Sequence, residues 1–548
     1  MRQKLFTFFS HTKLLFYIVF LINLGLVIAG LYQKQAFHSD EQWSYAHANS
    51  SHGAYLDVGI DSFYELNDEI KQRLYDHWID GKVFHDYLTV QPDERFSYKN
   101  IYHNLEVVEH PPLYFILIHT ICSFFPDCFS KWYAGSINIL SFILIYIFLF
   151  KLANIFLKND WLALYCVALW GFSGIGLATA IYLRMYVLQT LLFLCLLYQT
   201  SQILLQDKVQ NKQIFLIFLY SFLGIFCQYS SIFLSFFVAL TSGIILLFHK
   251  KYKLLLKFEM AMAMSLLMLF LLFPTAYDIL FHSLRGSQVL YNLASFSAIH
   301  NVKFSLYEID IRLSYFMQMF SEQFLPFSNT NYKLFAFVII VGFVLMIFFK
   351  CKFNLLTKWL ISIWILYFLY LLAMPYMHAF HSRFYMCLMP VMSLFLVMSI
   401  RNLATNLRVK ENQIIIFIAF LVMINSLVFA LKKNPYAFTY HAAEQNISQN
   451  IQGKPVFIDS VSNVIFLHSM VYLLAKADKV FVFDDICNEK LHQNILQTPD
   501  PIVLTYNSYI FQNLIQDNPS CLKKIGLSNI SKICASQYCY LVWQKNKS

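Results

Sequence analysis

Long apolar segments recur along this chain and are separated by short polar stretches. A bilayer core about 30 Å thick is crossed by roughly 20 mostly apolar helical residues, and such segments continue to about residue 431. The pattern predicts a polytopic α-helical membrane protein with about eleven transmembrane helices. We expect them near residues 14–31, 132–150, 161–181, 186–204, 213–229, 231–248, 258–276, 334–349, 359–374, 384–400 and 413–431.

The composition agrees with this class. Of the 548 residues, 58% are hydrophobic and only 13% are charged, whereas a soluble domain carries about 25% charged residues. The formal net charge of +10 comes from Lys and Arg in the short loops between apolar segments. It therefore gives no indication of a nucleic-acid partner. Membrane lipids are the expected surroundings.

The distribution of Lys and Arg predicts the orientation, because short cytoplasmic loops carry an excess of both. The N-terminus contains Arg2, Lys4 and Lys13, so we expect it in the cytoplasm and residues 32–131 outside. The same count puts the C-terminal segment outside. Cleavage of the first segment as a signal peptide is the less favoured alternative, because its apolar run exceeds the roughly 7 to 15 residues of a signal core.

The apolar stretch 111–127 is an exception to the spanning pattern. It is too short for a span, and counting it as one would put every later Lys/Arg cluster on the wrong side. It begins at Pro111 and Pro112, and prolines are tolerated at the start of a helix. We therefore expect a juxtamembrane helix at the outer leaflet.

Three regions are long enough to do chemistry on the exterior. The first loop, residues 32–131, is acidic: its part 33–110 holds fourteen carboxylates against six Lys or Arg. A second large loop covers 277–332. The tail, 434–548, has short apolar runs that alternate with helical stretches, which predicts a small α/β domain. Residues 1–433 then form the transmembrane domain.

Four of the eleven cysteines lie in this tail. On the exterior they could form two disulfides with three alternative pairings, and the sequence does not choose among them. The four are Cys487, Cys521, Cys534 and Cys539.

Residues suited to catalysis or phosphate binding gather at the exterior ends of spans. Mid-span positions carry almost no ionisable residues, which disfavours an ion-coupled transporter, because such proteins keep charges along the ion pathway. The residues at the exterior ends are Asp40-Glu41 after the first span, Glu109-His110-Pro111-Pro112-Leu113-Tyr114 at the end of the first loop, Arg184 with Tyr186, and Arg383 with Tyr385.

Each of these residues also has a purely structural interpretation. Asp before a helix is a preferred N-cap, so Asp40 could cap residues 41–48. His110 could cap the turn in which it lies at the membrane interface. Arg and Tyr at headgroup level commonly anchor a span at the interface. Several such residues on the face of one acidic loop favour a functional site.

The order of these motifs resembles the GT-C membrane glycosyltransferases. Asp-Glu after the first span, then His-Pro-Pro-Leu-Tyr, Arg-Met-Tyr and Arg-Phe-Tyr, is similar to the branch with protein O-mannosyltransferases and the bacterial transferase that adds aminoarabinose to lipid A. The resemblance covers about residues 1–430. The tail carries none of these motifs and resembles the family only in its position, as an exterior C-terminal domain.

The resemblance implies a GT-C fold in a bacterial inner membrane, with the tail in the periplasm. It also implies an enzyme that takes a sugar from a polyprenyl-phosphate donor and transfers it, with inversion, to an acceptor hydroxyl or phosphate on the exterior face. Such a transfer needs a carboxylate that accepts the proton of the acceptor. Asp40 corresponds to the acid of the family's first loop and is the expected general base. Glu41 is expected beside it, in direct chemistry, in orienting Asp40 or in binding the acceptor.

The leaving lipid phosphate needs donors that meet its negative charge, and the planar guanidinium of arginine suits phosphate oxygens. The resemblance assigns Arg383 and Tyr385 to the donor phosphate first, and Arg184 with Tyr186 second. His110 is the further cation on the phosphate side. Glu109 and Tyr114 are expected to position the acceptor or the loop itself.

This chain departs from the family at two places. Residues 181–183 offer no acid, and Cys227-Gln228-Tyr229 stands where relatives have Thr-His-Tyr. The need for a divalent metal ion is therefore left open, and no other cofactor is indicated. A non-catalytic membrane scaffold or sensor, and a flippase or transporter of lipid-linked sugars, are the alternative functions. The sugar and the acceptor, whether lipid, glycan or protein, are not encoded in a readable motif.

Overall fold

The computed structural model divides the chain into two compact units. One unit contains Met1–Gly30 and Gly135–Ala437, and the other contains Leu31–Ala134 and Phe438–Ser548. The structure describes residues 2–34, 37–51, 72, 74–106, 108, 110–206, 208–281, 354–373, 382–431, 451–459, 467, 470–483, 485, 488–506, 522–523, 525–535 and 538–545, with the backbone alone at 2–11, 382, 421–422, 425–431, 529–535 and 538–540. The predicted span 334–349, most of the loop 277–332, Glu109, Cys487 and Cys521 lie outside the described residues.

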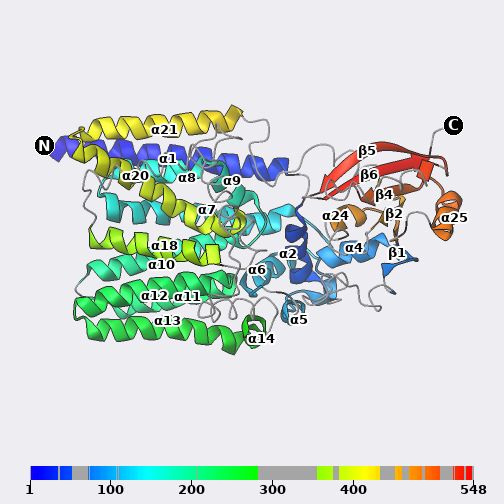
Figure 1. The fold of residues 1–548 in the computed structure, drawn as a ribbon, viewed down its shortest axis with the longest axis horizontal. Helices are drawn as coiled ribbons and strands as arrows, with labels where there is room; N and C mark the ends of the chain where they lie inside the picture. The colour runs from blue at the N-terminus through cyan, green and yellow to red at the C-terminus, as the bar shows by residue number, and fades with distance from the viewer. Residues whose placement is uncertain are drawn as a thin grey trace, which may run out of the picture. The chain divides into compact units, whose positions relative to one another are not determined.

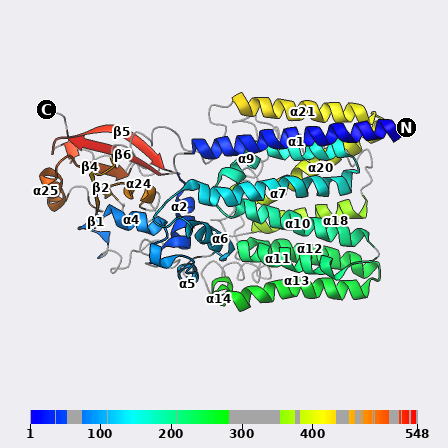
Figure 2. The same ribbon diagram turned by 180° about the vertical axis from the view of Figure 1, so that it is seen from behind.

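The first unit is helical (Figures 1 and 2). α10 to α13 pack side by side, α18 packs against α12, and α20 and α21 pack against α8. The helices are α1 (Arg2–Gln33), α7 (Lys131–Leu157), α8 (Asp160–Gly171), α9 (Gly174–Ile181), α10 (Tyr186–Leu205), α11 (Asn211–Cys227), α12 (Ser230–Phe248), α13 (Tyr252–Leu272), α14 (Thr275–Phe281), α18 (Leu355–Ala373), η4 (Ser382–Leu388), α20 (Met389–Asn406) and α21 (Glu411–Leu431).

These helices confirm the prediction of a polytopic helical chain. Among the described residues, six helices are long and apolar enough to cross a membrane, and a seventh span results if α8 and α9 are counted together. The count of about eleven stays a prediction. Polar contacts link the helices away from water, as Ser221 hydrogen-bonds Ser265 at 2.7 Å and the Trp359 indole donates to Ser242 at 2.9 Å.

The predicted span 161–181 is divided into α8 and α9, which meet at an angle of 62°. The break has a local cause. Ser173 caps α9 by accepting a hydrogen bond from the Gly176 amide at 3.0 Å, and the backbone approaches so closely that a Cβ on Gly176 would lie 2.1 Å from the Trp170 carbonyl oxygen. Small and capping residues therefore end one helix and begin the next.

The second unit combines the first loop with the tail in one six-stranded sheet. The strand order is β1-β3-β2-β4-β6-β5, in which β2 pairs parallel with β3 and β4 and the other pairs are antiparallel. The elements are α2 (Ser39–Asn49), β1 (Trp78–Asp80), α4 (Gly81–Leu88), η2 (Pro92–Glu94), α5 (Lys99–Leu105), α6 (Leu113–Cys122), β2 (Pro455–Asp459), α24 (Val471–Leu474), β3 (Lys479–Phe483), α25 (Glu489–Gln497), β4 (Ile502–Tyr506), β5 (Leu527–Ala535) and β6 (Tyr538–Lys545).

The tail has the predicted α/β character, and β1 is an addition that the sequence did not indicate. Trp78, which begins β1, is opposite Phe481 of β3 and packs on its ring at 5.4 Å. The first loop thus supplies an edge strand to a sheet that is otherwise made by the tail. The predicted domain boundary near residue 433 stays a prediction, while the compact units group the first loop with the tail.

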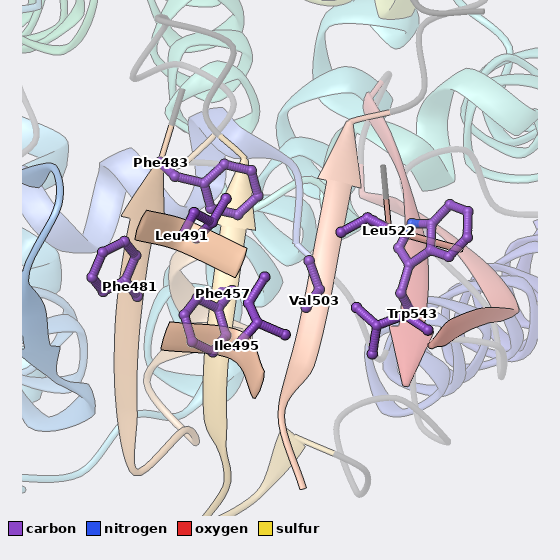
Figure 3. Packing of buried hydrophobic residues seen from close by; sticks show 9 residues of the cluster. Phe457, Phe481, Phe483, Leu491, Ile495, Val503, Leu522 and Trp543 are labelled. Carbon is purple, nitrogen blue, oxygen red and sulfur yellow. The ribbon is translucent and has the colours of Figure 1, made fainter. Parts of the chain in front are cut away.

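The sheet is covered on one face by α25 (Figure 3). Leu491 and Ile495, one helical turn apart, are buried against Phe457, Phe481 and Phe483 of the strands. Burial of such large side chains contributes about 1.5–3 kcal/mol each. This core stabilises the sheet in which β1 takes part.

Two of the tail cysteines are opposite each other in the backbone register of β5 and β6. Cys534 and Cys539 are Cα partners in the register. Directly opposite residues of antiparallel strands have Cα atoms about 4.5–5.5 Å apart, inside the range of a disulfide. The predicted disulfides are not tested by this register, but it favours the Cys534–Cys539 pairing among the alternatives.

Candidate functional site

The Asp40-Glu41 pair occupies the first turn of α2, and neither residue is the N-cap of this helix. His38 is the N-cap: its Nδ1 accepts from the Asp40 amide at 3.1 Å, while Glu41 Oε2 accepts from the His38 amide at 2.7 Å. This is a capping box, which satisfies amides that the helix leaves without partners. The structural interpretation of Asp40 as the cap is therefore wrong.

Asp40 is buried, with 9% of its side chain exposed. Its carboxylate lies 3.7 Å from His38 Nδ1, and its position at the helix N-terminus favours the charged form through the helix dipole. Its carbonyl oxygen accepts from the Ser44 hydroxyl at 3.0 Å, one turn later in α2. The backbone of Asp40 is therefore fixed by hydrogen bonds at both its amide and its carbonyl.

Glu41 has a different environment. Glu41 Oε2 lies 2.9 Å from Lys34 Nζ, and both side chains are fully buried. The Lys131 ammonium donates to the carbonyl oxygens of Tyr32 and Lys34, which holds the end of α1 where this ion pair forms. A carboxylate paired with a buried ammonium is stabilised in its charged form and is a poor proton acceptor.

The predicted juxtamembrane helix is α6, with Pro112 as its N-cap residue. α6 packs against α2. The rings of His47 on α2 and His110 in the turn before α6 both lie 6.1 Å from the ring of Phe115. Tyr114 is fully buried. The structure thus brings the His-Pro-Pro-Leu-Tyr segment against the helix that carries Asp40.

Tyr45 joins α2 to the beginning of α7. Its hydroxyl donates to the Ser130 carbonyl at 2.7 Å and accepts from the Ala134 amide at 3.1 Å. Burial raises the pKa of Tyr45 well above its ordinary value, and the nearby Cys122 thiol adds to the effect. The phenol therefore stays neutral and serves as a fixed structural link one turn after Glu41.

The other predicted residues belong to the helical unit. Arg184 follows α9 and is 2% exposed, and its guanidinium is near enough to interact electrostatically with Tyr186. The chain is held here by Asn138 of α7, whose amide donates to the carbonyl oxygens of Ala180 and Tyr182 at 3.1 and 2.7 Å. Arg184 therefore has a defined position at the start of α10.

The structure brings the two Arg-x-Tyr motifs together, although 199 positions (383 minus 184) separate their arginines. The Arg383 guanidinium donates to the Tyr182 hydroxyl at 3.4 Å. Phe384 meets Tyr186 edge to face at 6.1 Å, and Tyr186 stacks on Tyr182 at 5.9 Å. The result is a patch of guanidinium, phenol and aromatic groups, which can bind an anion attached to an apolar chain.

Sequence reasoning did not identify three residues that organise these clusters. His38 and Lys34 fix the Asp-Glu pair, and Tyr182 is the partner of Arg383. A His two residues before Asp40 was a readable capping signal. The other two contacts depend on the fold. Within the described residues, no group of three or more His, Cys, Asp or Glu could hold a metal ion.

Comparison of the sequence with protein families and with curated proteins finds no match. Among solved structures, the chain is similar to ArnT from Cupriavidus metallidurans in the apo state, with a TM-score of 0.52, 10% identity, and 98% of each chain covered. The same protein bound to undecaprenyl phosphate gives a TM-score of 0.50 at 9% identity, covering 96% of this chain and 97% of that one. These likenesses show that the chain has a fold similar to that of ArnT.

Proposed function

We propose that this chain is a membrane glycosyltransferase that moves a sugar from a polyprenyl-phosphate donor to an acceptor on the exterior face. The observation that carries the proposal is the fold similarity to ArnT, which extends over nearly the whole length of both chains. One of the two ArnT structures is bound to undecaprenyl phosphate. A polyprenyl-phosphate sugar is the corresponding donor for this chain.

In the proposed reaction the acceptor oxygen attacks the anomeric carbon on the face opposite the phosphate. The bond from that carbon to the phosphate oxygen breaks, its electron pair leaves with the lipid phosphate, and the configuration inverts. Asp40 accepts the proton of the acceptor. Its place in the first turn of α2 and its fixed backbone support this role.

We assign the developing charge of the lipid phosphate to Arg383 and Tyr385, with Arg184, Tyr186 and His110 as further donors. The contact of Arg383 with Tyr182 supports the assignment, because a guanidinium held in advance stabilises charge without reorganisation. Glu41 is a positioning residue in this proposal, because its buried ion pair with Lys34 occupies the carboxylate.

Glu109 and Tyr114 remain assigned to the positioning of the loop or acceptor. The full burial of Tyr114 supports a role in holding the loop. The proposed cellular location is the bacterial inner membrane, with the first loop and the tail in the periplasm.

Transfer by the purified full-length chain tests the proposal, with a panel of undecaprenyl-phosphate sugars as donors. We expect Asp40→Asn to lower turnover by about 100-fold or more, the usual range for loss of a general base. Asp86→Asn is the matched control, since it removes a carboxylate of the same unit that pairs with Lys82. Full transfer by Asp40→Asn with an unchanged unfolding midpoint would refute the assignment. Mass spectrometry of envelope glycans from a deletion strain would identify the acceptor.

A further inference from the structure

Gln42 of α2, the helix that carries Asp40, contacts the tail. Gln42 is 2% exposed, and its Oε1 accepts from the Tyr472 amide at 2.8 Å across a sequence separation of 430 residues. Its amide nitrogen donates to the Phe37 carbonyl at 3.3 Å. Gln42 therefore joins the tail to the segment that leads into α2.

This hydrogen bond has a clear physical basis at the tail end. Tyr472 is the second residue of α24, a short helix that begins at Val471. Amides in the first turn of a helix have no acceptor within the helix, and the N-cap side chain of α24 makes no capping hydrogen bond. Gln42 supplies the acceptor for one of these amides. Loss of this partner would leave the partly buried amide without its protein acceptor, which is unfavourable.

Aromatic contacts reinforce the same link. The Tyr472 ring meets Phe37 at 4.8 Å and Phe129 at 5.1 Å. Phe129 also contacts Tyr45 of α2 at 4.7 Å. The cluster therefore holds the chain on both sides of Asp40, at Phe37 before it and at Tyr45 after it. Aromatic pairs of this kind add stabilisation beyond their burial.

We infer that Gln42 and Tyr472 are positioning residues, through which the tail fixes the Asp40 carboxylate for the transfer reaction. This inference rests on the proposed function. It assigns the tail a direct part in catalytic geometry, in addition to any role in acceptor choice. A displacement of about 1 Å at a reacting group costs about 100-fold in rate, so a small shift of α2 has a large effect.

The first experiment measures turnover in the full-length chain for Gln42→Met and Tyr472→Ala. Turnover is expressed per donor site, with sites counted by titration with undecaprenyl phosphate. We expect about 10- to 100-fold lower kcat per site with the donor KM unchanged. A merely structural role would lower the number of sites and leave kcat per site unchanged. That result would overturn the inference.

Lys545→Met is the matched control in the tail. Lys545 donates to the carbonyl oxygens of Leu496 and Thr498, so the change removes side-chain hydrogen bonds of the tail that do not involve α2. We expect kcat per site to stay within about twofold of wild type. An equal loss in this variant would show that any weakening of the tail suffices, which contradicts a specific role of Gln42.

A second experiment does not depend on activity. Hydrogen exchange of the amides of residues 39–49 should be faster in Gln42→Met and Tyr472→Ala than in wild type, and unchanged in Lys545→Met. Unchanged exchange in the first two variants would overturn the inference. If wild type neither transfers sugar nor binds undecaprenyl phosphate, the proposed function fails, and the exchange measurement still decides whether the tail holds α2.

Discussion

Two adjacent carboxylates at the start of α2 have different surroundings. Glu41 is fully buried with Lys34, whereas Asp40 keeps 9% of its side chain exposed beside His38. Burial of an ion pair removes water from both charges, so the pair holds its geometry only while both partners are present. Asp40 is the acid that we propose as the proton acceptor. The division of roles that we propose for the two acids thus rests on Lys34, directly after α1.

Removing the Lys34 ammonium should destabilise the protein strongly. Lys34→Met takes away the cation from a buried carboxylate, which costs about 3–5 kcal/mol. The double variant Lys34→Met/Glu41→Gln removes both charges and should recover part of the loss, because the amide can still accept from the His38 backbone. Thermal unfolding in detergent, followed by tryptophan fluorescence, measures both.

Lys82→Met is the matched control for this prediction. Lys82 pairs with Asp86 at 3.2 Å, and the lysine side chain is 71% exposed. An exposed pair contributes about 1 kcal/mol or less, so the unfolding midpoint should change little. An equal drop in the unfolding midpoint for Lys34→Met and Lys82→Met would show that the buried Lys34–Glu41 pair stabilises the protein no more than the exposed pair does.

The sequence indicated which polar residues gather at the ends of spans that are predicted to be exterior, but it indicated only some of the contacts among them. Asp40 and Glu41 were readable as a pair because they follow the first span and fall in the first turn of a helix. The ion pair of Glu41 with Lys34 was not readable from the sequence, because it depends on how the chain turns between α1 and α2. The contact of Arg383 with Tyr182 joins positions 201 residues apart. Periodicity carries no information on such contacts.

At the scale of elements, α4 is seated directly on the backbone that leads into β3. The Gly81 amide donates to the Asp478 carbonyl at 3.1 Å, and a Cβ at Gly81 would lie 1.9 Å from the Ala477 carbonyl oxygen. No side chain fits this approach. The glycine therefore lets the first loop enter the sheet immediately after β1.

Gly81→Ala should weaken the joint between the first loop and the tail. The backbone must move to admit the methyl group, and we expect a loss of about 1–3 kcal/mol, as for other overpacked sites. Gly25→Ala is the control, because a Cβ there meets nothing within 4 Å and alanine favours the helix. Limited proteolysis and thermal unfolding compare the two. Equal stability of both variants would contradict this prediction, because it would show that the backbone at Ala477 moves to admit the methyl group at little cost in free energy.

Element prediction succeeded where the apolar pattern is strong. β2, β3, β4 and β6 lie at the apolar runs of the tail. β1 has three residues, too few for an alternating pattern, and its pairing with β3 is a tertiary contact. The break between α8 and α9 was marked by Gly171, Ser173 and Gly174, but an apolar count over the whole segment did not detect it.

At the scale of the molecule, the fold is shared with ArnT although only 9–10% of residues are identical. Apolar segments of spanning length and short polar connections restrict the possible arrangements strongly, because every backbone polar group in a bilayer must be satisfied within helices. This is why the class of fold was readable from the sequence. The pairing of the first loop with the tail in one sheet was not readable from the sequence, because the helices from α7 to α21 separate the two segments along the chain.

The pairing of β1 with β3 requires the first loop and the tail to lie on the same side of the membrane. Strands in one sheet cannot be separated by a bilayer, so the chain must cross an even number of times between Ala134 and Phe438. The eleven predicted spans leave ten in this interval (11 minus the first), which is even. The Lys and Arg distribution further predicts that the shared side is the exterior.

Labelling of single cysteines with a membrane-impermeant maleimide tests this topology. In a background with the native cysteines replaced by serine and the wild-type unfolding midpoint retained, Lys82→Cys and Lys490→Cys should react in cells whose inner membrane is intact. Both positions are exposed, as is Lys250 in the turn between α12 and α13. Lys250→Cys should react only after the inner membrane is permeabilised. Opposite accessibility of Lys82→Cys and Lys490→Cys would contradict the shared sheet, whereas protection of both would preserve the sheet and reverse the orientation derived from charge.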